Sequence, residues 1–430
     1  MLYDNSLLTV SYVDMFQFSS DKFYETVARE TLDYILHDLT DETGAFYSTE
    51  DADSEGVEGK FYVWQKDEID AAVGDEVAPL FCEFYHVTEH GNFEEANILN
   101  QTESLESFAK KRKLDAAELA TKFERAKKAL LEIRNKRVRP GLDDKVLVNW
   151  NALAIIAMAR AGAAFNEPRY AAAAAKAAAF VLDKMRRDDG RLLHAWRHGE
   201  AKLDAYLDGY AGMILALLTL YQTDFNERWI DEAAELTKQM VNHFGDDETG
   251  DFYFTADDHE QLIARVKDFQ DNSVPSGNAL AATGLQMLGR LLGQDQWLER
   301  AGKVIAAGSN LMRRAPLAAG QMLIAAENML DQNYELVLMG PTKESVASSL
   351  IELRSHFLPN VTLICRTDDN TENRSALVDE VLSGKKSLND QVTIYVCQNH
   401  TCKKPVSGEA EVLAAIKEVA KRVDMLDAGK

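Results

Sequence analysis

Four long segments of the chain are almost continuously apolar, and each is followed by a segment with one apolar and one polar face. The apolar segments, Leu2–Phe16, Trp150–Phe165, Ala205–Tyr221 and Ser276–Leu292, are rich in Ala, Leu and Met, which favours helices buried on all sides. After the third segment, apolar residues recur at steps of three and four, with charged residues between them. That spacing predicts an amphipathic helix. Its apolar positions are Trp229, Ile230, Ala233, Leu236, Met240 and Phe244.

A short polar break joins the two helices of each pair, and an aromatic residue opens the second helix. These aromatic residues are Phe23, Tyr170, Trp229 and Trp297. Repetition of a buried helix, a tight turn and an amphipathic helix predicts two concentric helix rings. We therefore expect a mainly α fold, an (α/α)6-type toroid of helical hairpins, over residues 1–331. Within it, residues 66–137 depart from the pattern, with a short helix near 67–73 and a long charged helix near 116–135.

From Tyr334 onward, strand patterns alternate with helix patterns. Strands are predicted at 335–340, 361–365 and 392–397, and helices at 343–357 and 409–423. This alternation indicates a small α/β module over residues 332–430.

Composition limits the partners and the compartment. The net charge of −23 repels phosphate backbones and anionic lipid surfaces, so neither nucleic acid nor a membrane is an expected partner. No apolar run approaches the ~20 residues of a membrane span, and the first residues do not resemble a signal peptide. Four cysteines do not form a disulfide framework, so a cytoplasmic location is predicted.

The toroid topology predicts where polar residues gather. If inner and outer helices alternate, the inner helices are parallel, and their N-termini share one end of the ring with the outer-to-inner connectors. Polar and aromatic residues at the inner N-termini are Tyr3, Asp4, Trp150, Asn151, Asp208, Tyr210, Ser276 and Asn278. Those in the connectors are Glu50, Asp51, Asp53, Tyr62, Trp64, Asp144, Lys145, Trp196, Arg197, His259, Arg265, Asp268 and Asp271. Acids beside aromatic faces indicate a cavity for a small sugar-like ligand.

Each of these residues also has a simpler interpretation. Ser276 and Asp208 suit the N-cap position of a helix, and His259 could form a surface ion pair. The acidic run at 50–55 could be a solvated turn. It lacks the glycine and closing glutamate of an EF-hand loop, and we predict neither a metal nor a cofactor.

Two kinds of sugar chemistry remain open. Hydrolysis needs two carboxylates ~5–9.5 Å apart, for which the candidates are Asp51 or Asp53 with Asp144, Asp208 or Asp271. Epimerisation needs a base on each face of a carbon beside a carbonyl, for which His259 with His194 or His198 is the candidate pair. The abundance of acids favours hydrolysis or simple binding.

Several motifs resemble one known family. They are Met-Leu-Tyr-Asp-Asn at 1–5, Glu-Asp-Ala-Asp-Ser-Glu-Gly-Val-Glu-Gly-Lys-Phe-Tyr-Val-Trp at 50–64, Gly-Asn-Phe-Glu at 91–94, Leu-Asp-Asp-Lys-Val-Leu at 142–147 and Pro-Ser-Gly-Asn at 275–278. Together they resemble the thioredoxin-domain-containing spermatogenesis-associated proteins. This resemblance implies a six-hairpin toroid similar to N-acylglucosamine 2-epimerases and six-hairpin glycosidases.

The resemblance also implies what this chain lacks. Family members carry a thioredoxin-like domain and further helices before the first motif, so we expect an N-terminally truncated chain whose toroid is short of a hairpin. Two motifs differ from the family: Gly209 follows Asp208 where a second aspartate is usual, and Asn149-Trp150-Asn151-Ala152 replaces Ser-Trp-Asn-Gly.

A non-catalytic role is the alternative function. The chain could be a scaffold or binding domain that serves a thioredoxin-like redox partner. Cys397 and Cys402, with His400 between them, are spaced more widely than a thioredoxin-type pair and offer too few ligands for zinc. A redox or metal role and a plain pair of cysteines at a strand end both remain open.

Overall fold

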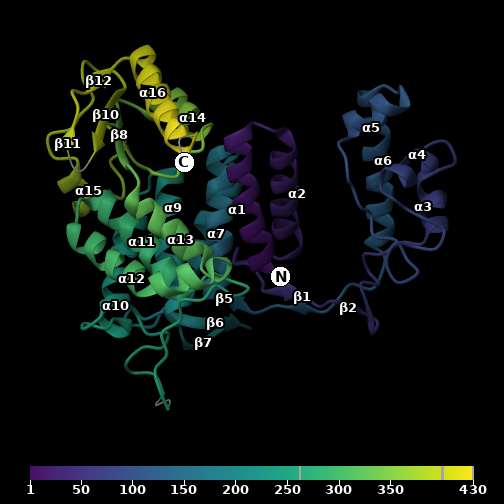
Figure 1. The fold of residues 1–430 in the computed structure, drawn as a ribbon, viewed down its shortest axis with the longest axis horizontal. Helices are drawn as coiled ribbons and strands as arrows, with labels where there is room; N and C mark the ends of the chain where they lie inside the picture. The colour runs from purple at the N-terminus through teal and green to yellow at the C-terminus, as the bar shows by residue number, and fades with distance from the viewer. Residues whose placement is uncertain (261–262, 399–400, 429–430) are drawn as a thin grey trace. The chain divides into compact units, whose positions relative to one another are not determined.

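The computed structural model describes residues 1–260, 263–398 and 401–428 (Figure 1). The chain divides into two compact units. The first joins Met1–Ser48 to Asp144–Lys430, and the second is Thr49–Asp143. Each unit is described separately below.

Inner and outer helices alternate along the first unit, as the repeat predicted. The inner helices α1 (Leu2–Ser19), α7 (Val148–Ala164), α9 (Leu207–Asp224) and α11 (Gly277–Leu292) each pack against the next in chain order. Each also packs against the outer helix that follows it (Figure 1). The outer helices are α2 (Lys22–Asp38), α8 (Pro168–Lys184), α10 (Arg228–Phe244) and α12 (Asp295–Arg314). The predicted mainly α, toroid-type fold is confirmed.

A fifth, shorter inner helix was not predicted. After the 3-10 turn η1 (Pro316–Ala318), α13 (Gly320–Leu330) packs against α11 and α12. Its side chains Leu323, Ile324 and Leu330 are exposed.

Close contact between inner helices depends on glycine. A Cβ atom at Gly209 of α9 would lie 2.8 Å from Val148 Cγ1 on α7, and one at Gly277 would lie 2.9 Å from Leu207 Cγ. The outer helices bury one stripe each. In α10 all six predicted apolar positions are buried, beginning with Trp229 and ending with Phe244. The inner helices are buried on all sides and the outer helices on one side, which explains why the first have continuously apolar sequences and the second have one apolar stripe.

Short β arms connect the outer helices to the inner ones. Strands β5 (Val146–Leu147), β6 (Leu193–Arg197) and β7 (Glu200–Asp204) form one antiparallel sheet. The glycines that open the arms, Gly44, Gly190 and Gly250, have positive φ. The outer helices end several residues before these glycines, and each glycine closes a turn within its arm.

The C-terminal module belongs to the first unit. Its sheet has the order β11-β10-β8-β9, with β8 and β9 parallel and β8 and β10 antiparallel. The strands are β8 (Tyr334–Gly340), β9 (Val361–Thr367), β10 (Thr393–Gln398), β11 (Thr401–Cys402) and β12 (Val406–Ser407), and the helices are α14 (Lys343–Arg354), α15 (Ala376–Val381) and α16 (Glu409–Ala428). A buried ion pair fastens the module to the helices: Arg366 Nε lies 2.6 Å from Glu227 Oε1.

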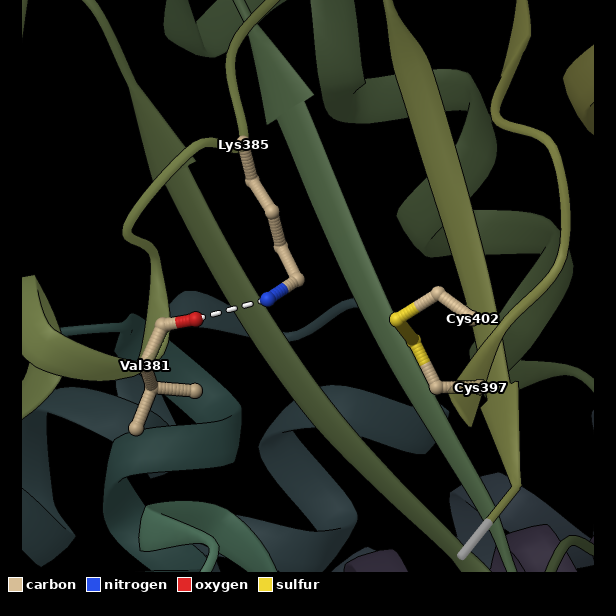
Figure 2. The surroundings of a disulfide bond; sticks show 4 residues. All are labelled: Val381, Lys385, Cys397 and Cys402. Carbon is tan, nitrogen blue, oxygen red and sulfur yellow. Dashed lines mark hydrogen bonds between the residues drawn. A yellow bond between two sulfur atoms is a disulfide. The ribbon is translucent and has the colours of Figure 1, made fainter. Parts of the chain in front are cut away.

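The two C-terminal cysteines form a disulfide. Cys397 on β10 is bonded to Cys402 on the antiparallel strand β11 (Figure 2). Nearby, Lys385 donates a hydrogen bond to the Val381 carbonyl (Figure 2). His400, the possible third ligand in the sequence motif, lies outside the described residues. Cys82 and Cys365 are buried and unbonded.

The second unit has its own small core. Trp64, Phe81 and Phe123 are among its buried residues. Both predicted helices of this region are present, as α3 (Lys66–Val73) and α6 (Ala116–Arg134). The remaining elements are β1 (Thr49–Glu50), β2 (Asp53–Ser54), β3 (Val57–Glu58), α4 (Ala78–Phe84), α5 (Leu105–Arg112) and β4 (Leu142–Asp143), which pairs with β1.

Among the described residues of both units, no helix combines the length and the apolar character that crossing a bilayer requires.

Candidate functional site at the amino-terminal ends of the inner helices

Two buried asparagines hold the β arms against the inner helices. On α7, Asn151 Oδ1 accepts a hydrogen bond from the Phe46 N–H (2.9 Å), and Nδ2 donates to the Phe46 and Leu147 carbonyls (2.9 and 3.0 Å). On α11, Asn278 makes the same pair of bonds with the Phe252 backbone. Both side chains are fully buried. Their polar atoms therefore serve the fold at two equivalent positions of the repeat.

Tyr210 fills the equivalent position on α9. Its hydroxyl accepts hydrogen bonds from the Leu192 N–H (2.9 Å) and from Arg191 Nε (3.1 Å). Arg191 in turn makes a bidentate ion pair with Asp258. We call Asn151, Tyr210 and Asn278 the clamp residues. All three were predicted to bind a ligand, and in the structure their polar groups bond to the arms.

A buried carboxylate lies in the first turn of α9. Asp208 Oδ2 accepts a hydrogen bond from Asn149 Nδ2 (2.7 Å), and Oδ1 accepts one from the Gly209 N–H (2.9 Å). Burial raises the pKa of Asp208 despite these two donors. His194 on β6 interacts with this carboxylate, yet burial lowers the pKa of the imidazole. At neutral pH the imidazole is therefore held in its neutral form.

Two imidazoles contact one tyrosine ring beside this carboxylate. His194 meets the Tyr206 ring edge-on with ring centroids 5.3 Å apart, and His259 stacks on Tyr206, also at 5.3 Å. Phe254 stacks on the same ring at 4.9 Å. His259 Nε2 is buried and has no hydrogen-bond partner within the described part of the chain. We call the following six residues the Tyr206 cluster: Asn149, His194, Tyr206, Asp208, Phe254 and His259.

The cluster joins predicted and unpredicted residues. Asp208 and His259 were candidate catalytic residues, and His194 was one of two alternative partners for His259. Tyr206 and Phe254 were not predicted. Tyr206 is the second residue of the predicted apolar segment 205–221, and in the structure it occupies the N-cap position of α9. The interpretation of Asp208 as that N-cap is therefore wrong.

Other predicted residues at this end form ion pairs and ring contacts. Asp144 Oδ1 lies 2.5 Å from Arg197 Nε, and its other oxygen is 3.8 Å from the exposed His198. Tyr3 meets Trp150 edge-on at 4.7 Å. Trp196 packs edge-on against Phe180, Lys145 precedes β5, and Asp4 is paired with the chain's amino group.

The connector before α11 uses its polar residues to hold the backbone. Asp271 accepts hydrogen bonds from the Ser276 N–H (2.9 Å) and the Gln321 N–H (2.8 Å), one on each carboxylate oxygen. Ser276 caps α11 through the Ala279 N–H, which confirms its N-cap interpretation. Arg265 donates to the Thr255 carbonyl and lies over the Tyr253 ring. Asp268 Oδ1 accepts a hydrogen bond from the Gln270 N–H.

Five predicted residues lie in the second unit. Glu50 accepts hydrogen bonds from the Tyr62 hydroxyl and from Arg139, both at 2.7 Å. Asp51 and Asp53 are exposed. Trp64 is buried with the Arg137 guanidinium 4.0 Å from its ring centroid.

One group of side chains has the composition of a metal site. Ligand atoms of His243, Asp257 and Asp258 lie within 4.8 Å of one another. However, His243 Nδ1 is already 2.9 Å from Asp257 Oδ1, and the Asp258 carboxylate holds Arg191. Internal partners thus occupy all three groups.

Comparison with known proteins gives clear sequence relatives. No protein-family model matches the chain. Human spermatogenesis-associated protein 20 is 30% identical over 96% of this chain and 57% of the human protein. An uncharacterized protein of Caenorhabditis elegans is 27% identical over 96% of this chain and 60% of its own length. The chain thus spans less than two thirds of the length of these relatives.

The solved structures that match the chain are less similar in sequence. A sugar epimerase from a ruminal bacterium is 16% identical, with a TM-score of 0.34 over 64% of this chain and 70% of that protein. A GH76 alpha-mannanase from Bacteroides thetaiotaomicron is 13% identical, with a TM-score of 0.38 over 58% of this chain and 71% of that protein. The sequence relatives confirm the resemblance in the motifs: the chain is a homologue of spermatogenesis-associated protein 20 over nearly all of its own length.

Proposed function

We propose that this protein is a sugar-processing enzyme that moves protons on its substrate, with the Tyr206 cluster as its acid–base centre. The observation that carries this proposal is the pairing of a buried carboxylate with two imidazoles around one ring. Asp208 interacts with His194, and both His194 and His259 contact Tyr206. Epimerisation and isomerisation of sugars need two such proton-transfer groups near one carbon.

His194 has the properties of a general base. A base must be unprotonated before it acts, and burial lowers the pKa of this imidazole. The nearby Asp208 carboxylate stabilises the imidazolium that forms when the base takes a proton. Asn149 and the Gly209 N–H fix that carboxylate from two sides. Asp208 is therefore a positioning and charge-stabilising residue in this mechanism.

His259 supplies the second proton-transfer group. Stacking on Tyr206 fixes its ring plane, and Phe254 supports Tyr206 from the same stack. Its Nε2 atom is buried without a partner among the described residues, so this nitrogen is free to exchange a proton with a ligand. Proton removal by one imidazole and return by the other would invert a carbon next to a carbonyl.

The carboxylates support two-acid hydrolysis less well. Asp144 is ion-paired with Arg197, and both oxygens of Asp271 accept backbone N–H groups. Hydrolysis needs one protonated acid and one free carboxylate across the bond. Within the described first unit, Asp208 is the predicted catalytic acid whose pKa burial raises.

Deuterium exchange tests the proposal. The full chain is incubated in D₂O with reducing monosaccharides and N-acyl amino sugars, and NMR follows deuterium entry next to the carbonyl carbon. We expect exchange with at least one sugar, and its loss in His194→Gln and His259→Gln. His198→Gln, at an exposed imidazole near Asp144, is the matched control and should exchange like the wild type.

Ligand binding distinguishes the scaffold alternative. A sugar present at 100 times its Kd adds about 2.7 kcal/mol to stability and raises the melting temperature. If no sugar raises the melting temperature and none exchanges deuterium, the enzyme proposal fails and a non-catalytic binding domain is favoured. Exchange that persists in both histidine variants would likewise reject the assigned residues.

A further inference from the structure

We propose that the Cys397–Cys402 disulfide is a thiol–disulfide exchange site, at which a negatively charged thiol attacks Cys402 and releases Cys397. The site lies in the C-terminal module and does not depend on the Tyr206 cluster. The bond joins residues that are directly opposite each other on β10 and β11 (Figure 2). The two cysteines are five positions apart, so the bond restricts the unfolded chain less than a long-range cross-link would.

The two cysteines differ in exposure. Cys397 is 3% exposed and packs in the main hydrophobic core, whereas Cys402 is exposed on β11. Strand β11 is two residues long and lies at the edge of the sheet beside β10. In thiol–disulfide exchange, the attacking thiolate must reach one of the two disulfide sulfurs. A thiolate from solution therefore reaches Cys402, and Cys397 becomes the leaving group.

Charge also distinguishes the two cysteines. Cys402 is followed by Lys403 and Lys404, which are both exposed. Cys397 instead faces Glu335 of β8 in the strand register. Neighbouring ammonium groups favour a thiolate and attract an anionic reactant, whereas a carboxylate disfavours a thiolate. Although the whole chain carries a charge of −23, the two lysines give the exposed cysteine a local preference for a negatively charged thiol.

The other two cysteines provide an internal comparison. Cys82 and Cys365 are buried and unbonded. Burial raises the pKa of their thiols, to about 11 for Cys82 and to about 12 for Cys365. Such thiols stay protonated at neutral pH and react slowly, because the thiolate is the nucleophile. Of the four cysteines, Cys402 is therefore the one at which exchange is expected.

The exchange has two steps. A thiolate forms a bond to Cys402 Sγ while the bond between the two protein sulfurs breaks, and Cys397 leaves with the electron pair and takes a proton from solvent. A second reactant thiol then attacks the mixed disulfide and releases Cys402, which is also protonated. The protein gains two electrons and two protons, and the two reactant thiols become one disulfide. In the reverse direction, Cys402 is the nucleophile.

Mixed-disulfide mapping on the full chain tests which cysteine reacts. In Cys397→Ser, Cys402 should react with oxidised glutathione at least about 10-fold faster than Cys397 reacts in Cys402→Ser. Peptide mass spectrometry locates the glutathione, and Cys82 and Cys365 should stay unmodified while circular dichroism remains native. If a variant does not fold, acid quenching of the wild type during reduction by glutathione should place the first mixed disulfide on Cys402. Equal reaction at both positions would overturn the assignment.

Charge substitutions test the class of thiol. Glutathione carries a net negative charge, and 2-mercaptoethanol carries none. Lys403→Gln combined with Lys404→Gln should slow reduction by glutathione about 3- to 10-fold and leave reduction by 2-mercaptoethanol unchanged. The difference should shrink at about 1 M salt. Lys343→Gln combined with Lys421→Gln removes the same charge at exposed positions of α14 and α16 and should react like the wild type.

Two results would overturn the proposal as a whole. One is a wild-type disulfide that glutathione leaves intact in the folded chain. The other is equal slowing of both thiols in the double lysine variant, because charge would then not select the reactant. Neither measurement involves a sugar, so failure of the exchange site and failure of the sugar-processing proposal are distinguishable.

Discussion

Replacement of the clamp residue Asn151 by alanine tests the repeat that builds the fold. The amide side chain satisfies the Phe46 N–H, the Phe46 carbonyl and the Leu147 carbonyl, all in a buried site. Alanine would leave the two Phe46 groups without partners. A buried polar group that loses its partner costs about 1–3 kcal/mol. We therefore expect a loss of about 3–5 kcal/mol in the free energy of unfolding.

Urea unfolding and hydrogen exchange measure this effect in complementary ways. The unfolding midpoint should fall, and mass spectrometry should show faster amide exchange around Phe46, because the arm loses its anchor on α7. Asn242→Ala on the exposed side of α10 is the matched control. It should change the unfolding free energy by less than about 0.5 kcal/mol. A loss below about 1 kcal/mol for Asn151→Ala, with unchanged exchange at Phe46, would refute the clamp interpretation.

Three further perturbations follow from the geometry. Burial lowers the pKa of His194 below its ordinary value of 6.5, so the unfolded chain binds a proton at this imidazole more readily than the folded chain does. The stability of the wild type should therefore fall relative to that of His194→Gln as the pH drops through 6.5. Melting curves recorded from about pH 8 to about pH 5 check the sign of this change, with His198→Gln as the control. Gly209→Ala should destabilise by about 1–3 kcal/mol, because its Cβ would lie 2.8 Å from Val148 Cγ1, and Val148→Ala in the same chain should restore part of that loss in urea unfolding. Cys402→Ser opens a loop whose cysteines are five positions apart, so the module should lose about 2 kcal/mol; a variant that melts like the wild type under oxidising conditions would contradict this.

The sequence predicted the helices well because their burial patterns are long and regular. The four inner helices begin and end within about three residues of the predicted bounds, and α10 buries all six of its predicted apolar residues. Helix α13 was missed because it is short and its apolar residues mix the buried Met322 and Ala325 with the exposed Leu323, Ile324 and Leu330. The sequence did not decide whether Cys397 and Cys402 form a disulfide, because their spacing does not show whether the strands that carry them pair.

The candidate site was harder to predict than the fold. In the structure, His194 and His259 both contact Tyr206, and His194 interacts with Asp208. Sequence could not separate residues that hold the backbone from residues with free polar atoms. Asn278 and Asp271 have the composition of ligand-binding residues, yet backbone groups take up their hydrogen bonds. Only coordinates show which side chains are already occupied.

Aligning the helical repeats helps to separate residues that hold the backbone from residues whose polar atoms could serve a ligand. Aligning the clamp residues Asn151, Tyr210 and Asn278 also aligns the residues two positions before them, which are Asn149, Asp208 and Ser276. Ser276 caps its own helix. Asn149 and Asp208 instead bond to each other between neighbouring helices.

The bond between Asn149 and Asp208 affects the electrostatics of the site. A cap bond stays within one helix and stabilises it, whereas the Asn149–Asp208 bond turns a buried carboxylate toward a neighbouring helix and toward His194. The carboxylate keeps a raised pKa because two donors do not offset its burial. At the position where Ser276 caps α11, α9 carries a costly buried acid. A buried acid at the position where α11 carries a helix cap is the reason to place the chemistry there.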